Sequence, residues 1–466
     1  MKIRFFGATR SVSGSLHVIE AGARRFLLDC GLFQGRGQDM YDRNAHLPVP
    51  AASVAAVFLS HAHVDHCGNL PRLVAQGFRG PIYATRATID LCSILLADSA
   101  YVLRTQIAQL NQRRERQTLA PLPELYGEDD VAQALRQMTL VQWDQPVQVA
   151  EEVSVSFHPA GHIVGASVIA VRELGNGGPC TLVFSGDLGR ENDWLFPNPV
   201  VPGGAQHLVV ESTYGDRCHR PYAYARSEFC REIAATIRTG GRVVIPAFAV
   251  GRSQRLLYEL HELMRTNELP RIPVYLDSPL SIKASEHFAA HADELGLLPD
   301  SAGALDWLQC RYVVSGEESR ALLERREPYI VITAAGMCEA GRVLRHLKRN
   351  LPDPASRVLF VGFCAADTLG RHLVDGHKQV RIAGETVPVR AGIDWFDTFS
   401  SHADQAGLLA WVRAQSEARS VFIVHGEEPQ AFALAEQLEN DGAREVVVPF
   451  ANEEFTLTPD AVRCCA

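Results

Sequence analysis

The chain has 466 residues, which is too long for one ordinary hydrophobic core and predicts two or three structural units. Hydrophobic residues make up 47% and charged residues 21%, a balance that excludes a disordered chain. The net charge of −9 and the pI near 6.0 argue against a broad basic surface that coats nucleic acid, although a local basic cleft is compatible with both values.

The amino-terminal residues and the cysteines favour a cytoplasmic protein. Residues 1–15 lack the apolar core and the small-residue cleavage site of a signal peptide, and no run of about eighteen apolar residues predicts a membrane span. The 11 cysteines are odd in number and form no Cys-x-x-Cys pair, which argues against a disulfide framework. We therefore expect a cytoplasmic chain without a membrane partner.

The first 210 residues predict a layered α/β domain with mixed sheets. Short apolar runs alternate with turns in the first sixty residues, which is typical of β-strands, and residues 91–137 have helical character. Strand patterns then return at residues 153–157, 167–171, 180–185 and 208–210.

From about residue 213 the pattern changes to a parallel α/β arrangement. Four stretches join a buried strand to a small-residue loop and an amphipathic helix, and they begin at Val243, Val274, Tyr329 and Arg357. Strands that are apolar throughout and alternate with helices predict a parallel sheet covered on both faces. Alternating strands resume after residue 376. We therefore predict one domain, residues 1–210 and 376–466, interrupted by another, residues 211–375.

A cluster of metal-binding side chains follows one buried strand. The apolar run at residues 55–60 leads directly into His61, His63, Asp65 and His66. Because residues i and i+2 that leave a strand point the same way, His61 and His63 can bind one metal ion. Asp65 and His66 lie at the following turn and can face a second ion. Imidazole and carboxylate groups are ligands suited to zinc, although manganese or iron also fits such a set.

This segment resembles the His-x-His-x-Asp-His motif of the metallo-β-lactamase superfamily. Three other positions of the family pattern follow, each at the end of a predicted strand: Asp29, His162 and Asp187. The resemblance implies an αββα sandwich in which Asp187 bridges two metal ions and Asp29 orients their ligands from behind. His158, close to His162, would be the spare histidine.

Three further motifs resemble those of the β-CASP branch of this superfamily, whose members cut RNA. They are carried by Glu211 in VESTYG, His402 in FSSHAD and His425 in IVHG. The resemblance covers nearly the whole chain and is closest to compact bacterial and archaeal relatives of the eukaryotic pre-mRNA 3′-end cleavage subunit. It implies that a parallel β-CASP domain interrupts the αββα sandwich. Histidine at position 425 is typical of RNA-acting members, whereas DNA-acting relatives usually carry valine.

The resemblance implies a two-zinc ribonuclease that acts on single-stranded RNA and leaves 5′-phosphate and 3′-hydroxyl ends. One zinc ion would be held by His61, His63 and His162, the other by Asp65, His66 and His425, with Asp187 between them. Phosphodiester hydrolysis needs an activated nucleophile, a neutralised phosphate and a proton for the leaving oxygen, and two metal ions supply the first two. We expect His402, oriented by Glu211, to donate the proton. The expected catalytic residues are Asp65, Asp187, Glu211 and His402.

Three predicted helices of the inserted domain begin with a Gly-Arg pair. A helix N-terminus offers free N–H groups, and an arginine there can add a bidentate phosphate contact. Small residues at other strand ends lie where open α/β sheets bind ligands. We expect this edge to follow the RNA backbone through Arg252, Ser278, Gly336, Gly341, Arg342 and Arg371. The alternative is that the glycines only mark helix starts and the arginines are solvated.

Three other functions stay open from the sequence. The chain could act on an ester, thioester, lactam or sulfate, it could cut DNA, or it could be a non-catalytic RNA-binding subunit. The filled ligand positions argue against the last, because non-catalytic β-CASP members lose ligands. The sequence does not separate endonuclease from exonuclease action, and a homo-oligomer is compatible with it.

Overall fold

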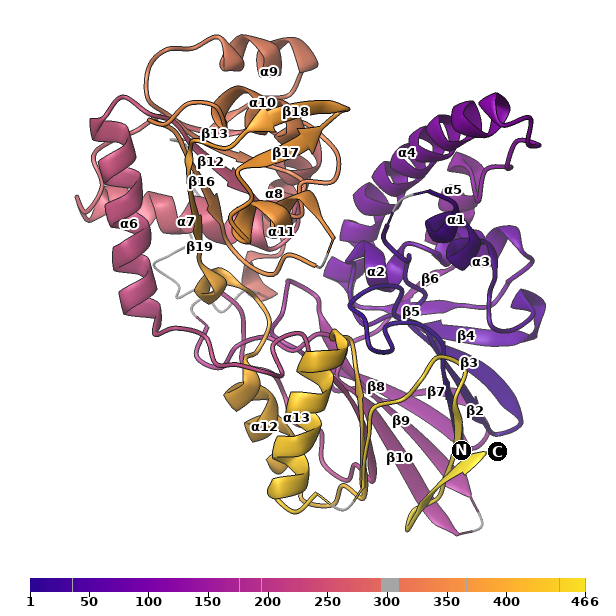
Figure 1. Ribbon diagram of the computed structural model, residues 1–466. Helices are drawn as coiled ribbons and strands as arrows, with labels where there is room; N and C mark the ends of the chain where they lie inside the picture. Colours follow the sequence, from indigo (N-terminus) through magenta and orange to yellow (C-terminus); the bar gives the residue numbers. More distant parts are fainter. Residues whose placement is uncertain are drawn as a thin grey trace. The chain divides into compact units, whose positions relative to one another are not determined.

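The computed structural model describes residues 1–466 apart from residues 36, 176, 194, 295–309, 366, 444 and 466 (Figure 1). Its internal contacts divide the chain into two compact units. The first unit joins Met1–Cys218 to His402–Ala466, and the second consists of His219–Ser401. Among the described helices, none combines the length and the hydropathy needed to span a membrane.

Two mixed sheets form the first unit. An eight-stranded sheet has the order β23–β22–β1–β2–β3–β4–β5–β6 and a seven-stranded sheet has the order β21–β20–β11–β10–β9–β8–β7. The strands of the first sheet are β1 (Lys2–Phe5), β2 (His17–Ala21), β3 (Arg24–Leu28), β4 (Val54–Phe58), β5 (Ile82–Ala84), β6 (Met138–Leu140), β22 (Glu454–Leu457) and β23 (Val462–Cys465). Those of the second are β7 (Val147–Ala150), β8 (Val153–Pro159), β9 (Ser167–Gly175), β10 (Gly178–Phe184), β11 (His207–Glu211), β20 (Ser420–Val424) and β21 (Val446–Val447).

The core of this unit lies between the two sheets. Phe26 and Phe58 from the first sheet and Phe157 and Phe184 from the second belong to one buried apolar cluster. Burying each such ring stabilises the fold by about 1.5–3 kcal/mol relative to exposing it. The helices of the unit are α1 (Gly37–Ala45), α2 (Val64–Cys67), α3 (Leu70–Ala75), α4 (Arg86–Arg116), α5 (Glu128–Arg136), α12 (Gln405–Arg413) and α13 (Glu428–Asn440). In Figure 1, α1–α5 lie on the side of β4–β6, whereas α12 and α13 lie beside the second sheet, which confirms the expected αββα sandwich.

The second unit contains a six-stranded parallel sheet with the order β14–β13–β15–β12–β16–β19. Its strands are β12 (Val243–Pro246), β13 (Val274–Leu276), β14 (Cys310–Tyr312), β15 (Ile330–Thr333), β16 (Arg357–Phe360) and β19 (Gly392–Trp395). Its helices are α6 (Tyr222–Arg238), α7 (Arg252–Arg265), α8 (Pro279–Ala290), α9 (Gly316–Leu323), α10 (Val343–Asn350) and α11 (Leu369–Val374). The four predicted strand–loop–helix stretches correspond to β12–α7, β13–α8, β15–α10 and β16–α11. The two apolar clusters on the faces of this sheet are the covered faces that the apolar strands predict.

The inserted unit ends later than the sequence pattern suggested. The hairpin β17 (Gln379–Ile382) and β18 (Glu385–Pro388) precedes β19, which pairs in parallel with β16. Residues 376–401 therefore belong by their contacts to the second unit, and the chain returns to the first unit at His402. The alternating apolar pattern of this stretch comes from a hairpin and an edge strand of the insert, which the sequence alone does not distinguish from strands of the first domain.

A buried carboxylate ties three elements of the second unit together. Asp277 follows β13 and is fully buried. Its Oδ2 accepts hydrogen bonds from Ser319 Oγ at 2.6 Å and His346 Nε2 at 2.7 Å, while its Oδ1 accepts one from Arg342 Nη1 at 2.7 Å. Although burial alone would raise the pKa of Asp277, these donors hold it below its usual value.

Replacing Asp277 by alanine is expected to lower the free energy of unfolding by about 3–5 kcal/mol, because it breaks a buried ion pair, leaves the buried His346 Nε2 without its acceptor and removes the carboxylate partner of Arg342. Urea denaturation at neutral pH measures the change. The stabilisation from Asp277 is present above pH of about 4, the usual range of a carboxyl group, and is lost as the pH falls through its depressed pKa.

The matched control is Asp375→Ala. Asp375 accepts a hydrogen bond from Arg371 Nε at 2.8 Å in an exposed pair, for which a change below about 1 kcal/mol is expected. Equal effects of the two substitutions would show that the buried network contributes nothing beyond a surface pair.

Candidate metal centre

The predicted ligands lie at the carboxyl ends of strands that run in the same direction. Strands β3 and β4 are parallel neighbours in the first sheet, and β10, β11 and β20 are parallel neighbours in the second. Strand β8 runs parallel to β10 because both are antiparallel to β9. Asp29 follows β3, His61 and His63 follow β4, His162 follows β8, Asp187 follows β10, Glu211 ends β11, and His425 follows β20. Strand direction therefore brings residues far apart in sequence to one edge of the sandwich.

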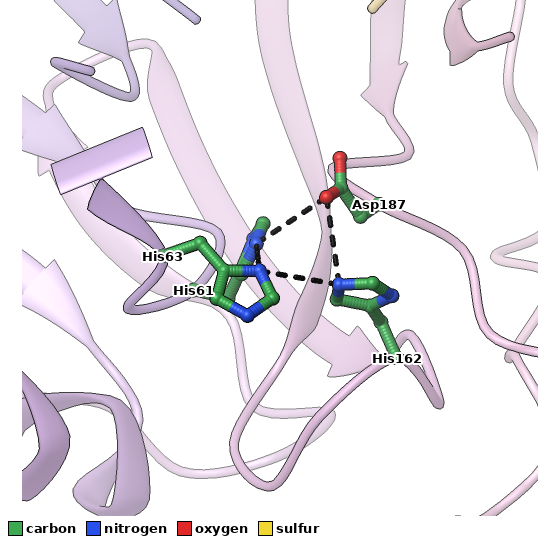
Figure 2. Close-up of side chains that lie close together, drawn as sticks. All are labelled: His61, His63, His162 and Asp187. Carbon is green, nitrogen blue, oxygen red and sulfur yellow. Dashed lines mark hydrogen bonds and ion pairs between the residues drawn. The ribbon is translucent and has the colours of Figure 1, made fainter. Parts of the chain in front are cut away.

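His61, His63, His162 and Asp187 form the first group, in which one ligand atom from each residue lies within 4.8 Å of the others (Figure 2). His63 Nδ1 lies 3.0 Å from His61 Nε2 and 3.3 Å from His162 Nε2. Asp187 Oδ2 lies 3.4 Å from His61 Nε2 and 3.5 Å from His162 Nε2. Four ligand atoms bound tetrahedrally to a zinc ion at about 2.0–2.1 Å would be about 3.4 Å apart. The donor types and spacing of this group therefore fit such an ion.

Asp65, His66 and His425 form the second group. His425 Nε2 lies 3.2 Å from His66 Nε2 and 3.5 Å from Asp65 Oδ2. Asp187 faces this group as well, because its Oδ1 lies 3.3 Å from His66 Nε2. One carboxylate thus presents an oxygen to each group, which is the arrangement of a bridging ligand.

Burial keeps the imidazoles of the first group in the form that binds metal. It lowers the pKa of His61 to about 3 and that of His63 to about 4, and the pKa of His162 lies well below its usual value for the same reason. These rings are therefore neutral at pH 7, as a metal ligand must be.

The carboxylates and His66 show that positive charge is favoured between the two groups. Burial opposes ionisation of Asp65 and Asp187, yet the neighbouring histidines hold the pKa of both carboxyl groups below the usual range. Burial would likewise lower the pKa of His66, but the carboxylates of Asp187 and Asp29 raise it well above its usual value. A bound cation satisfies the same carboxylates that favour this proton.

Asp29 orients His66 from behind, as the family resemblance implies. Its Oδ2 accepts a hydrogen bond from His66 Nδ1 at 2.6 Å, which leaves Nε2 of that ring directed at the second group. Hydroxyl groups of Ser15, at 3.1 Å, and Ser60, at 2.9 Å, also contact Asp29 Oδ2. Ser60 Oγ also lies 3.1 Å from His61 Nδ1 and 3.4 Å from His66 Nδ1, so one hydroxyl contacts residues of both groups.

The contacts of Ser15 and Ser60 with Asp29 were not predicted from the sequence. The position of Ser60, directly before His61 and at the end of β4, is a signal that could have identified it. Ser15 has no comparable signal, because only the fold brings it to Asp29.

His402 and Glu211 are joined beside the two groups. His402 Nδ1 lies 3.0 Å from Glu211 Oε1. That oxygen also accepts a hydrogen bond from the Leu188 N–H at 2.8 Å, and Oε2 accepts one from the Thr213 N–H at 3.2 Å. Glu211 is fully buried, so its carboxylate is a fixed acceptor for the imidazole. The ring centroid of His402 lies 4.4 Å from that of His162, which places His402 at the edge of the first group.

His158 takes no part in either group. Its Nδ1 lies 2.6 Å from Asp144 Oδ1 and its Nε2 lies 2.9 Å from Ser156 Oγ. The ligand groups found in the described part of the chain include His162 but not His158. The family resemblance likewise implies that His162 is the metal ligand.

Arg342 is held by acceptors within the second unit. Its Nη1 donates to Asp277 Oδ1 and to the Val313 carbonyl at 2.9 Å, and its Nη2 donates to the Val314 carbonyl at 2.8 Å. These acceptors hold the guanidinium within the second unit, and a contact between Arg342 and phosphate stays a prediction.

The Gly-Arg pairs do not mark three helix starts. Gly251 is the N-cap of α7 with φ of 81°, as predicted, but Arg342 is itself the N-cap of α10. Gly370 and Arg371 lie inside α11, whose N-cap is Thr368. Helix boundaries here depend on which residue caps the first turn, which the dipeptide pattern does not reveal.

The other expected RNA contacts follow strands of the parallel sheet. Arg252 is 6% exposed and packs so closely on Gly362 that a Cβ there would lie 2.3 Å from its guanidinium carbon. Ser278 caps α8 by accepting a hydrogen bond from the Ser281 N–H at 3.1 Å. Gly336 and Gly341 lie in the loop between β15 and α10.

An αββα sandwich whose strand ends bring two His/Asp groups together is the architecture of a metallo-β-lactamase-type metal-binding protein. Residues 18–176 match the "Metallo-beta-lactamase superfamily domain", residues 253–373 match the "Beta-Casp domain", and residues 386–449 match the "Zn-dependent metallo-hydrolase RNA specificity domain".

Two curated relatives extend this match over almost the whole chain. Ribonuclease TTHA0252 of Thermus thermophilus is 38% identical over 449 residues, which covers 94% of this chain and 96% of that protein. Transcription termination factor FttA of Methanosarcina mazei is 30% identical over 455 residues, or 93% of this chain and 68% of that protein. The chain therefore belongs to the β-CASP family of the metallo-β-lactamase superfamily.

A solved structure shares the fold. The crystal structure of a protein of unknown function from Enterococcus faecalis is similar over 98% of this chain and 99% of that one, with a TM-score of 0.53 and 15% identity. At this identity the likeness concerns the fold alone.

Proposed function

We propose that the chain is a two-zinc ribonuclease that hydrolyses phosphodiester bonds in single-stranded RNA. The observation that carries this proposal is the convergence of two ligand groups on Asp187, with the His402–Glu211 pair beside them. The similarity to a ribonuclease along 96% of that relative supports the same activity here.

The donor set supports zinc in both groups. His61, His63 and His162 would hold one ion, Asp65, His66 and His425 the other, and Asp187 would contact both. When bound, two such ions lower the pKa of a water molecule and neutralise the charge of the phosphate. The protein contributes the imidazoles and carboxylates of the two groups, of which His61, His66, His162, Asp187 and His425 are buried.

The His402–Glu211 pair would supply the proton for the leaving oxygen. Glu211 already accepts two backbone N–H groups, so it acts as the acceptor toward His402 and keeps the proton of that contact on Nδ1. Donation then requires a second proton on the ring, carried by Nε2, and this is the proton that would pass to the leaving oxygen and leave His402 neutral. The implied products carry 5′-phosphate and 3′-hydroxyl ends.

We also propose that loops at the carboxyl edge of the parallel sheet in the second unit contact the RNA backbone. The supporting features are the Gly251–Arg252 helix start and the glycine-containing loop with Gly336 and Gly341. Ser278, Arg342 and Arg371 belong to the same proposal. We also propose that the protein is cytoplasmic and that it can form a homo-oligomer.

Cleavage of a 5′-labelled single-stranded RNA and of its DNA counterpart tests the proposed activity. Zinc-loaded wild-type protein is expected to cut the RNA and spare the DNA, and His63→Ala is expected to remove this activity because the first group loses a ligand. The matched control is His46→Ala, since His46 is an exposed histidine of the same unit.

The pattern of products also separates endonuclease from exonuclease action. A protein that binds two zinc ions and cuts neither substrate would contradict the ribonuclease proposal and favour a binding subunit or another hydrolytic substrate. Equal cleavage by His63→Ala would show that the activity lies elsewhere or in a contaminant.

A further inference from the structure

A buried hydroxyl lies behind His425. Thr213 follows β11, and only 2% of it is exposed. Its Oγ1 lies 3.2 Å from His425 Nδ1 and 3.2 Å from the His425 carbonyl oxygen, although the two residues are 212 positions apart in the chain. The parallel pairing of β11 with β20 brings them together, because both residues follow those strands directly.

His425 Nδ1 has two polar neighbours, the Thr213 hydroxyl at 3.2 Å and Asp187 Oδ1 at 3.5 Å, and both contacts favour a proton on that nitrogen. A threonine hydroxyl has one hydrogen to donate, and a carbonyl oxygen can only accept. When Thr213 donates to the His425 carbonyl, its oxygen must accept from His425 Nδ1–H. The proton on Nδ1 leaves the lone pair of the neutral ring on Nε2. Nε2 is the nitrogen that lies 3.2 Å from His66 Nε2 and 3.5 Å from Asp65 Oδ2.

The same hydroxyl also supports a strained backbone. His425 has φ of 48°, a left-handed conformation that is uncommon for residues other than glycine. Its N–H donates to the Ala8 carbonyl at 2.7 Å, and its carbonyl accepts from the Ser212 N–H at 3.2 Å as well as from Thr213. His425 is therefore held both at its backbone and at Nδ1 of its ring.

The two histidines of the second group are held differently. The carboxylate of Asp29 accepts from His66 Nδ1 at 2.6 Å, whereas a neutral hydroxyl accepts from His425 Nδ1 at the longer distance. Hydrogen bonds to charged groups are roughly twice as strong as those between neutral groups. Asp187 Oδ1 also faces His425 Nδ1, but at 3.5 Å, so the Thr213 hydroxyl is the nearer of the two groups that hold this nitrogen.

We propose that Thr213 is a positioning residue that fixes the tautomer and orientation of His425 and thereby sets the affinity of the second group for its metal ion. The inference rests on the proposed function only for its consequence in catalysis, since metal binding can be measured without any substrate. It concerns one group alone, because the contacts of Thr213 described here reach His425 and not the histidines of the first group.

The test compares Thr213→Val with Thr213→Ser. Valine keeps the shape of the side chain but removes the hydroxyl, whereas serine retains it. We expect Thr213→Val to bind one zinc ion as tightly as the wild type and the other about 10- to 100-fold more weakly, as is typical when the group behind a histidine ligand is removed. Thr213→Ser should restore the affinity. Zinc content after equilibrium with a graded series of chelator concentrations gives both affinities.

Ser212→Ala is the matched control. Ser212 is a neighbouring buried residue whose hydroxyl donates to the Val424 carbonyl at 2.8 Å and not to the ring of His425. Its loss should leave both zinc affinities unchanged, so a similar loss in both variants would assign the effect to general loosening of the strand ends. Circular dichroism and the thermal midpoint of each variant identify one that fails to fold. If Thr213→Val does so, Thr213→Ala, which also lacks the hydroxyl but is smaller, replaces it in the comparison with Thr213→Ser.

The outcomes also separate this inference from the proposed function. The wild type could bind two zinc ions without cutting RNA, while Thr213→Val binds one of them weakly. That result would support the role of Thr213 and contradict the ribonuclease proposal. Active wild-type protein with unchanged zinc binding in Thr213→Val would overturn the role of Thr213 and leave the ribonuclease in place.

Discussion

His402→Ala should cut RNA about 10²- to 10⁴-fold more slowly than the wild type while it keeps its full metal content. His402 contacts Glu211 and is a member neither of the first ligand group, which has four residues, nor of the second, which has three. Its loss removes the proton donor for the leaving oxygen but leaves the ligands of both groups in place. Single-turnover cleavage, measured beside the zinc content of the same preparation, gives the two quantities.

His158→Ala provides the comparison for this variant. His158 is a histidine on β8 that pairs with Asp144 and Ser156, so its removal should change neither rate nor metal content. Full activity of His402→Ala with both ions bound would contradict the assignment of the proton donor. A loss of metal in the same variant would instead identify His402 as a ligand, because it also lies close to Asp187 and Glu211.

Asp187→Asn should weaken metal binding at both groups and abolish measurable RNA cleavage. One carboxylate oxygen faces His61 and His162 and the other faces His66, so a neutral amide removes charge from both groups at once. Loss of a residue that only supports a ligand typically costs about 10- to 100-fold in metal affinity, and we expect the loss of a direct ligand to exceed this. Zinc titration of the metal-free protein measures the two affinities.

Asp65→Asn is the control for Asp187→Asn, because Asp65 belongs to one ligand group whereas Asp187 faces both. Asp65 contacts His425 in the second group, so this variant should lose affinity there and keep it in the first group. If Asp187→Asn weakened only one group, as Asp65→Asn is expected to do, the bridging position of Asp187 would be wrong.

The sequence predicted the fold where its local pattern has one structural meaning. Apolar strands such as Val243–Pro246 alternate with amphipathic helices only in a covered parallel sheet, and the interrupted sandwich follows from that change in pattern. Residues 379–395, which the pattern assigns to the interrupted domain, form a hairpin and an edge strand whose contacts lie in the second unit. A strand pattern reports local geometry, and it does not say to which sheet the strand belongs.

The candidate site, like the fold, was predicted from the sequence only in part. Residues carried by compact motifs, such as His61, His63 and Glu211, were predicted from the sequence, and the structure brings them to one place. Groups that act through contacts across the chain were not predicted. Thr213 meets its partner only through the pairing of two strands, and the use of Arg342 by internal acceptors depends on Asp277 and on carbonyl groups of a distant loop.

The order of the strands in the first unit has a consequence for how the protein is made. All four residues of the first ligand group have left the ribosome's catalytic centre by residue 187, before the second unit is synthesised. The second group must wait for His425, and the two sheets must wait for their last strands, β20 to β23. The nascent chain can therefore gather one set of ligands early, while the complete site exists only after the insert has been translated. A chain that stops within the insert would carry metal-binding side chains on an unfinished sandwich, which makes such fragments poor metal carriers and ready substrates for proteolysis.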